Sequence, residues 1–176
     1  MNAASLINYL IQKNIISLTM KEKQNLCSKI GSDVILGIDQ KNLVLAYKNK
    51  IKKIKKNLKI FTLLIKPNFG CSTKLIYKNV RNFSKSSLNN KFIKNISLKK
   101  IKLLKNDLEK VAKSKYPKIE KLLNFMKNLK DNEFVRMTGS GSCFVEYFKY
   151  NKDSISTLKK FKKKYPNYWS VLSKTV

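Results

Sequence analysis

Apolar residues recur at helical spacing near the start of the chain, and a second helix is signalled soon after. The first helix is predicted over residues 3–13. Thr19 and Glu22 have the spacing of a capping box, which predicts that a second helix begins there and runs to about residue 30. Gly31 then stands where helices commonly end. The apolar positions that define the first helix are Leu6, Ile7, Leu10 and Ile11.

The remaining pattern mixes strands and helices without a regular βαβ rhythm, which predicts the α+β class. Apolar or alternating runs predict strands over residues 42–47, 60–66, 134–137, 143–150 and 168–173. Helical patterns cover residues 72–79, 105–115, 117–130 and 153–164. We expect residues 48–59 to form a turn with weak strand or helix character. The polar segment 81–96 is predicted to be a loop.

Composition excludes two classes of protein. Hydrophobic residues make up 43% of the chain, which supports a packed core and argues against disorder. The longest apolar run, Ile60–Ile65, is far too short to span a bilayer. The first residues lack the basic region of a signal peptide. We therefore expect a cytoplasmic protein with no membrane partner.

The net charge of +29 makes a nucleic-acid partner an alternative to consider. Only Arg81 and Arg136 are arginines among 39 basic residues, whereas arginine is the residue preferred for bidentate recognition of bases and phosphates. Lys, Asn and Ile share A/T-rich codons, so genome composition accounts for the bias. We expect no specific nucleic-acid partner. A small basic nucleic-acid-binding protein remains the alternative, with Tyr147, Phe148 and Tyr150 as its stacking residues.

The chemistry open to the chain is limited by what it lacks. It contains no His, and its three cysteines are widely spaced. A structural zinc site needs about four such ligands at close spacing, so no metal site is predicted. Nucleophilic machinery of the Ser-His or Cys-His type is excluded within this chain. Any acid–base step then depends on Asp, Glu, Lys or Tyr.

The segment from Thr138 to Ser142 has the composition of an anion-binding loop. Gly139 and Gly141 allow backbone conformations that other residues avoid, and they let a ligand approach closely. Successive N–H groups in such a loop form a nest for anions, and the side chain of Ser140 adds a hydroxyl donor. A hairpin turn that needs glycine explains the same residues equally well.

Asp33 is one of only ten acidic residues in this basic chain, and it follows Gly31 at a predicted helix end. A tight turn there can direct its carboxylate into a cleft, where it could act as an acid–base group. The alternative is an ordinary turn or cap residue.

Three short segments, taken together, resemble the GHMP kinases. Asn2-Ala3-Ala4 is similar to the end of the family's second motif, a glycine-rich loop that leads into a helix. Gly31-Ser32-Asp33-Val34 stands where the family has its conserved aspartate. Thr138-Gly139-Ser140-Gly141 resembles the third motif.

Two further segments resemble one branch of the family rather than its homoserine, mevalonate or galactose kinases. They are Pro67–Thr73 and Asn106-Asp107-Leu108-Glu109, the latter followed by Pro117. The resemblance implies ATP-dependent phosphorylation of the 2-hydroxyl of 4-diphosphocytidyl-2-C-methyl-D-erythritol, in the non-mevalonate route to isoprenoids. ATP, Mg²⁺ and this small molecule are the implied ligands. The sequence leaves the oligomeric state open.

The resemblance also assigns roles to residues and a fold to the chain. It implies that Asp33 is catalytic and that Thr73 contacts the substrate. The nucleotide contacts would be Met1, Asn2, Gly139, Ser140 and Gly141. The implied fold is the two-lobe GHMP architecture, with residues 1–50 a remnant of the N-terminal domain and residues 51–176 a C-terminal domain containing a ferredoxin-like lobe.

This sequence also departs from the family pattern. Ile35 replaces a usual proline, and Lys48-Asn49-Lys50 stands where a G-x-G-E segment is expected. Family members carry a further segment before the position of Met1, which holds the catalytic lysine and most of the phosphate loop. We therefore expect the chain to be inactive alone.

Overall fold

The computed structural model describes residues 2–31, 33–38, 42–46, 50–54, 58–85, 88–129 and 131–175. The chain forms two compact units, residues 1–57 and residues 58–175. Helices and antiparallel sheets occur in both units, so the predicted α+β class is confirmed.

The first unit packs two helices against a short 3₁₀ helix and a hairpin. Its elements are α1 (Asn2–Gln12), α2 (Met20–Ile30), η1 (Val34–Gly37), β1 (Leu43–Ala46) and β2 (Lys50–Lys53). The two strands pair antiparallel. Because β2 pairs with β1, the first unit continues past residue 50, to residue 57. The assignment of family domains to residues 1–50 and 51–176 remains a prediction.

The core of the first unit is small and lies between α1, α2 and η1. Its buried residues are Ala4, Ile7, Cys27 and Val34. The capping box predicted for α2 is present, because Thr19 and Glu22 exchange hydrogen bonds. Gly31 ends α2 with an extended backbone at φ 168°, so it does not adopt the left-handed conformation usual for glycine at this position.

The second unit contains four strands and six helices among its described residues. The strands are β3 (Phe61–Lys66), β4 (Phe134–Met137), β5 (Phe144–Phe148) and β6 (Trp169–Lys174). The helices are α3 (Thr73–Asn79), α4 (Asn90–Lys94), α5 (Leu98–Leu103), α6 (Asp107–Lys115), α7 (Pro117–Lys127) and α8 (Asn151–Lys164).

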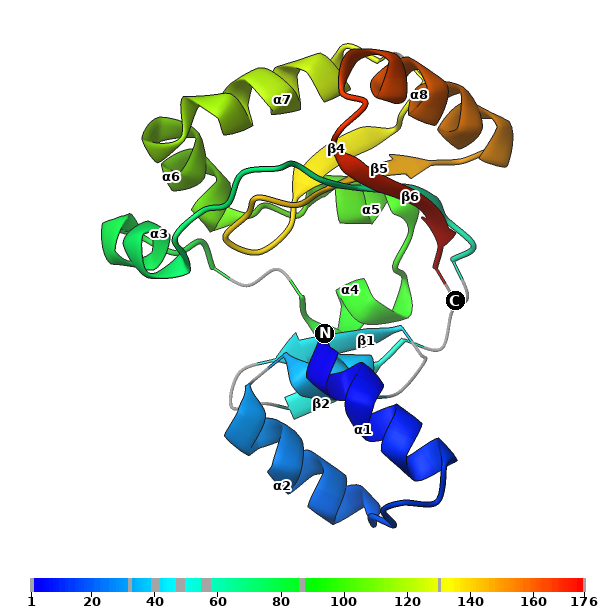
Figure 1. Ribbon diagram of the computed structural model, residues 1–176. Helices are drawn as coiled ribbons and strands as arrows, with labels where there is room; N and C mark the ends of the chain where they lie inside the picture. The colour runs from blue at the N-terminus through cyan, green and yellow to red at the C-terminus, as the bar shows by residue number, and fades with distance from the viewer. Residues whose placement is uncertain are drawn as a thin grey trace. The chain divides into compact units, whose positions relative to one another are not determined.

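The sheet of the second unit has the strand order β4-β5-β3-β6, and every neighbouring pair is antiparallel. With helices between β3 and β4 and again between β5 and β6, the chain follows the β-α-β-β-α-β path of the ferredoxin-like fold. Helices α7 and α8 cover one face of the sheet, and α5 lies on the other face (Figure 1). The ferredoxin-like lobe predicted from the sequence is thus present.

Alternation along the strands builds the core between the sheet and its covering helices. Leu63 on β3 pairs with Glu146 on β5, and Phe144 and Phe148 on the same face of β5 are fully buried. Helices α7 and α8 contribute Leu123, Met126 and Phe161, among other buried side chains. Since this core is continuous, the sheet gives a rigid base for the β4–β5 loop.

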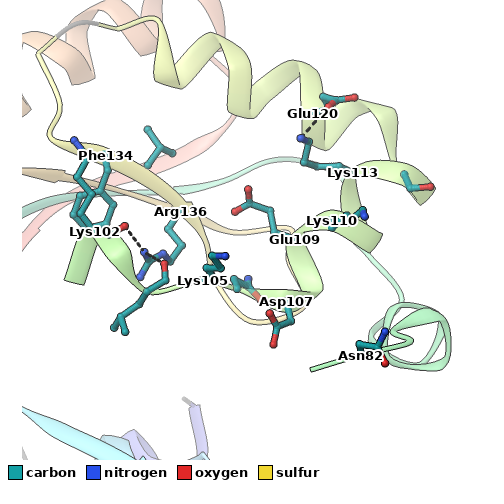
Figure 2. A pocket seen from close by; sticks show the side chains of 14 residues that line it. Asn82, Lys102, Lys105, Asp107, Glu109, Lys110, Lys113, Glu120, Phe134 and Arg136 are labelled. Carbon is teal, nitrogen blue, oxygen red and sulfur yellow. Dashed lines mark hydrogen bonds and ion pairs between the residues drawn. The ribbon is translucent and has the colours of Figure 1, made fainter. Parts of the chain in front are cut away.

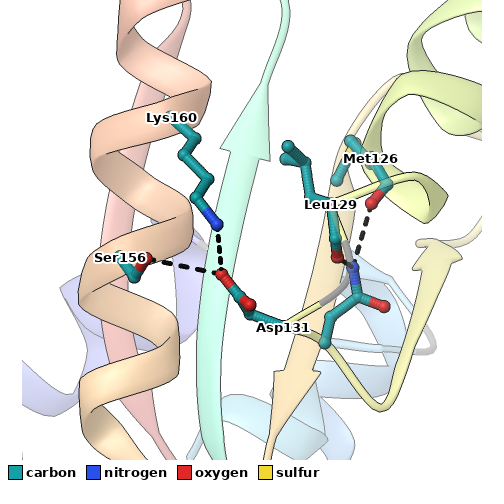
Figure 3. A network of polar contacts seen from close by, with 6 residues as sticks. Met126, Leu129, Asp131, Ser156 and Lys160 are labelled. Carbon is teal, nitrogen blue, oxygen red and sulfur yellow. Dashed lines mark hydrogen bonds and ion pairs between the residues drawn. The ribbon is translucent and has the colours of Figure 1, made fainter.

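A polar network ties the turn after α7 to α8 (Figure 3). Lys160 on α8 donates to Asp131 at 2.7 Å, and Ser156 donates to the same carboxylate. The hydrogen bond from Lys160 lowers the pKa of Asp131. Asn132 donates to the carbonyls of Met126 and Leu129, which closes the end of α7.

The prediction of a loop over residues 81–96 was wrong in part, because this region contains α4. Asn89 caps α4 by accepting from the N–H of Phe92 at 2.8 Å. Ser97 caps the next helix, α5, in the same way through Lys100. No helix among the described residues has the length and apolar character needed to cross a membrane.

Candidate functional site

The loop between β4 and β5, residues 138–142, is called the glycine loop below. It closes on itself through two backbone hydrogen bonds. The N–H of Thr138 donates to the carbonyl of Cys143, and the N–H of Gly141 donates to the carbonyl of Thr138, both at 2.9 Å. Gly139 and Gly141 adopt positive φ values of 49° and 89°. These conformations favour glycine over other residues, so the glycines at both positions are explained by the backbone.

The start of α3 docks on this loop. The hydroxyls of Thr73 and Ser140 are hydrogen-bonded at 2.9 Å, and the hydroxyl of Ser142 donates to the carbonyl of Phe69. Ser72 caps α3 through its side chain, and its own N–H donates to the hydroxyl of Tyr116 at 2.9 Å. The structure therefore brings the predicted substrate residue, Thr73, into contact with the predicted nucleotide loop.

Asn106, at the N-terminus of α6, also contacts this loop. Its side-chain amide donates to the carbonyls of Met137 and Gly139 at 3.0 and 2.8 Å. The sequence had marked Asn106 only as part of a family resemblance and had given it no role. The glycine loop is thus hydrogen-bonded to residues at the start of both α3 and α6.

Two cysteine thiols lie beside the loop. Cys71 directly precedes the cap of α3, and Cys143 directly follows the loop. Burial raises the pKa of the Cys71 thiol, and the neighbouring Cys143 raises it further. A raised pKa keeps the thiol protonated near neutral pH, so it is not an activated nucleophile.

A hollow of about 790 Å³ lies next to α6 and β4, and Figure 2 shows its mixed charges. Several of these groups already have partners. Lys113 pairs with Glu120 at 3.0 Å, and Asp107 accepts from both the N–H and the hydroxyl of Ser84. Arg136 donates to the carbonyls that end α5. This hollow was not predicted, since its residues come from separate parts of the chain.

Asp33 belongs to the first unit, whereas Thr73 and the glycine loop belong to the second. Its side chain is exposed, and it stands at the N-terminal end of η1 without capping that helix. Asn2 begins α1, but its side chain lies outside the described residues, as does Met1 altogether. The roles predicted for Asp33, Met1 and Asn2 therefore remain predictions.

Within the described ranges, no group of three or more His, Cys, Asp or Glu side chains is placed to hold a metal ion. The aromatic residues considered for nucleic-acid stacking are also largely engaged elsewhere. Phe148 is fully buried in the core, and Tyr147 stacks on Phe134 at a centroid distance of 4.3 Å. The nucleic-acid alternative gains no support from this arrangement.

Comparison with known families finds a match within the second unit. Residues 92–167 match the family described as "GHMP kinases C terminal". The similarity therefore lies in the C-terminal domain of the GHMP kinases. The matched region begins in α4, includes the glycine loop and α8, and ends just before β6.

Two relatives of this chain share one name. It is 43% identical, over all of its 176 residues, to a protein of Pelagibacter ubique (strain HTCC1062) named 4-diphosphocytidyl-2-C-methyl-D-erythritol kinase, and it covers 63% of that protein. A protein of the same name from Prochlorococcus marinus (strain NATL2A) is 30% identical over 78% of the chain. The chain spans 49% of that second relative.

A solved structure shares the fold. The crystal structure of a 4-(cytidine 5'-diphospho)-2C-methyl-D-erythritol kinase superposes with a TM-score of 0.72. The match covers 97% of this chain and 62% of the other, at 18% sequence identity. The GHMP kinase architecture expected from the sequence is thereby confirmed.

Proposed function

We propose that the protein containing this chain transfers the terminal phosphoryl group of ATP to the 2-hydroxyl of 4-diphosphocytidyl-2-C-methyl-D-erythritol. The observation that carries the proposal is the 43% identity, across every residue of the chain, to a relative with that kinase name. The contact between Thr73 and the glycine loop gives local support, because it joins a predicted substrate residue to a predicted nucleotide residue.

Phosphoryl transfer needs positioned reactants and neutralised charge more than covalent chemistry from the protein. In this proposal, the loop from Thr138 to Ser142 lies against the phosphates. Gly139 has a positive φ, and a Cβ there would meet no atom within 4 Å, so its backbone is open to the ligand. Thr73, at the start of α3, contacts the acceptor substrate. The N-terminus of α1 at Asn2 offers N–H groups to the nucleotide.

Asp33 is the proposed group that orients or deprotonates the attacking hydroxyl. It is acidic in a chain with only ten acidic residues, and its side chain is exposed beside η1. A carboxylate in this role accepts a proton from the hydroxyl as the new bond to phosphorus forms.

Mg²⁺ would enter with ATP. The described residues include no metal-ligand cluster of their own, so the phosphate oxygens of the nucleotide would supply most of its ligands. The ion would neutralise the charge of the transferred group.

A chimeric enzyme tests the proposal without any assumption about the limits of the chain. The 176 matching residues of the Pelagibacter relative are replaced by this chain, and ATP-dependent phosphorylation of the cytidyl substrate is followed by mass spectrometry. We expect activity toward this acceptor and none toward homoserine, mevalonate or galactose. A folded chimera that is inactive, beside an active parent, would contradict the proposal.

The role of Asp33 is tested in the same chimera. Asp33→Asn should lower the rate of phosphoryl transfer by about 10²-fold or more, since a positioned acid–base group contributes about 10²–10⁴-fold, with little change in nucleotide binding. Asp153→Asn, which makes the same change in the first turn of α8, is the matched control and should retain the full rate. Near-normal turnover in Asp33→Asn would make Asp33 a turn residue only.

A further inference from the structure

Asn106 makes three hydrogen bonds that join α6 to the glycine loop. Its amide nitrogen donates to the carbonyl of Met137 at 3.0 Å and to that of Gly139 at 2.8 Å. Its amide oxygen accepts from the N–H of Leu108 at 3.1 Å, which caps α6. An amide side chain can donate two hydrogen bonds and accept a third, whereas a hydroxyl has one hydrogen to donate, a carboxylate only accepts and a lysine only donates.

The loop has little other packing at the position that Asn106 holds. A Cβ atom built at Gly139 meets no atom within 4 Å, so side-chain contacts do not fix this residue. A backbone with positive φ and no packing would sample several conformations. The turn bond from Gly141 to Thr138 encloses this peptide, and the hydrogen bond from Asn106 to the carbonyl of Gly139 fixes the direction of its plane.

Fixing that plane also fixes a donor. The carbonyl of Gly139 and the N–H of Ser140 belong to one planar trans peptide, so they point in opposite directions. When the carbonyl is held toward Asn106, the N–H of Ser140 is directed away from α6. A backbone N–H held in a fixed direction is the element from which an anion nest is built.

We propose that Asn106 is a positioning residue, which orients the Gly139–Ser140 peptide so that the N–H of Ser140 is aimed at the phosphates of the nucleotide. The inference rests on the proposed kinase function for the identity of the ligand. The restraint itself rests only on the three hydrogen bonds. A preorganised donor needs no rearrangement when charge develops in the transition state, so its loss should affect the rate more than binding.

Two substitutions separate the hydrogen bonds to the loop from the role of Asn106 as the helix cap. Asn106→Asp keeps an acceptor for the N–H of Leu108 but has no donor for the two carbonyls. Asn106→Ser also keeps a cap residue, is uncharged and is too short to reach the loop. Asn89→Asp is the matched control. Asn89 caps α4 by accepting from the N–H of Phe92, so this substitution makes the same change at a helix cap away from the loop.

The first measurement is amide hydrogen exchange in the 176-residue chain. Amide exchange of residues 138–143 should become roughly 10-fold faster in both Asn106 variants, while the exchange rates of the α6 amides stay unchanged. Asn89→Asp should leave the loop unchanged. Unchanged loop exchange in both Asn106 variants would overturn the inference, whatever the result of the kinase assay.

The second measurement is steady-state kinetics in the chimera, well below its unfolding temperature. We expect kcat to fall about 10-fold, with KM for ATP within about 2-fold, because the donor acts mainly in the transition state. Faster loop exchange with an unchanged kcat would show that Asn106 only stabilises the fold. Inactivity of the unsubstituted chimera would instead contradict the proposed function. The exchange experiment would still decide whether Asn106 restrains the loop.

Discussion

The hydroxyls of Thr73 and Ser140 lie 2.9 Å apart, although 67 positions separate the two residues in the chain. Thr73 begins α3, and Ser140 is in the loop between β4 and β5. The residue predicted to contact the acceptor substrate is therefore bonded to a residue predicted to contact the nucleotide. A substitution of either residue should therefore change the contribution of the other to stability.

This contact predicts energetic coupling between the two side chains. Thr73→Val and Ser140→Ala each remove one hydroxyl with little change of shape, and the double substitution should cost less than the sum of the single ones. We expect a coupling free energy of about 0.5–1 kcal/mol, since one neutral and partly exposed hydrogen bond is lost in each case. Urea unfolding of the four proteins measures it. Strictly additive losses would show that the bond does not form in solution.

The two loop glycines should differ in their tolerance of a side chain. A Cβ at Gly141 would lie 2.9 Å from the sulfur of Met137, which is buried, and 3.5 Å from both the sulfur of Cys71 and the Cδ1 atom of Ile119. Strain at φ 89° adds to this crowding, so Gly141→Ala should lower the free energy of unfolding by roughly 2–4 kcal/mol.

Gly139→Ala is the matched control for that substitution. Gly139 also has positive φ, but a Cβ there meets nothing within 4 Å, so only the backbone term of about 1 kcal/mol applies. Equal losses in the two variants, measured by urea unfolding, would mean that packing against Met137 does not restrict the loop.

Much of the fold could be predicted because local signals are strong where apolar patterns are long. The capping box at Thr19 and Glu22 and the buried strand ending before Pro67 both stand where the sequence placed them. Helices α4 and α5 were missed because they have only five and six residues, too few to show a period. Their caps, Asn89 and Ser97, were the available signals.

The residues of the candidate loop could be predicted from the sequence, but the hydrogen bonds that hold the loop in place could not. Gly139 and Gly141 stand out in the sequence because glycine between two predicted strands is typical of a tight turn or a ligand-binding loop. The bonds from Asn106 to the loop could not be predicted, since they join residues 31 and 33 positions apart. Such contacts depend on how α6 packs against the sheet, which no local pattern encodes.

Glu146 is the most unusual charged residue of the sheet. It lies on β5 between Phe144 and Phe148, it is fully buried, and neither of its carboxylate oxygens has a hydrogen-bond partner among the described residues. Burial raises the pKa of this carboxyl to about 8. A buried carboxylate without partners is costly, so the folded protein holds Glu146 protonated at neutral pH.

This burial predicts that stability falls as pH rises. Below about pH 4 the carboxyl is protonated in both states, and Glu146 contributes no pH dependence. Between there and pH 8 the folded state binds one proton more than the unfolded state, so the free energy of unfolding decreases with pH and levels off above pH 8. Glu146→Gln has no such proton, so its stability advantage over the unsubstituted chain should grow by roughly 3–4 kcal/mol from pH 5 to pH 8.5. Urea unfolding across this range measures the difference, with Glu133→Gln, an exposed glutamate beside β4, as the control that should show no such trend. Parallel stability curves for Glu146→Gln and the unsubstituted chain would show that Glu146 reaches water or a partner in solution.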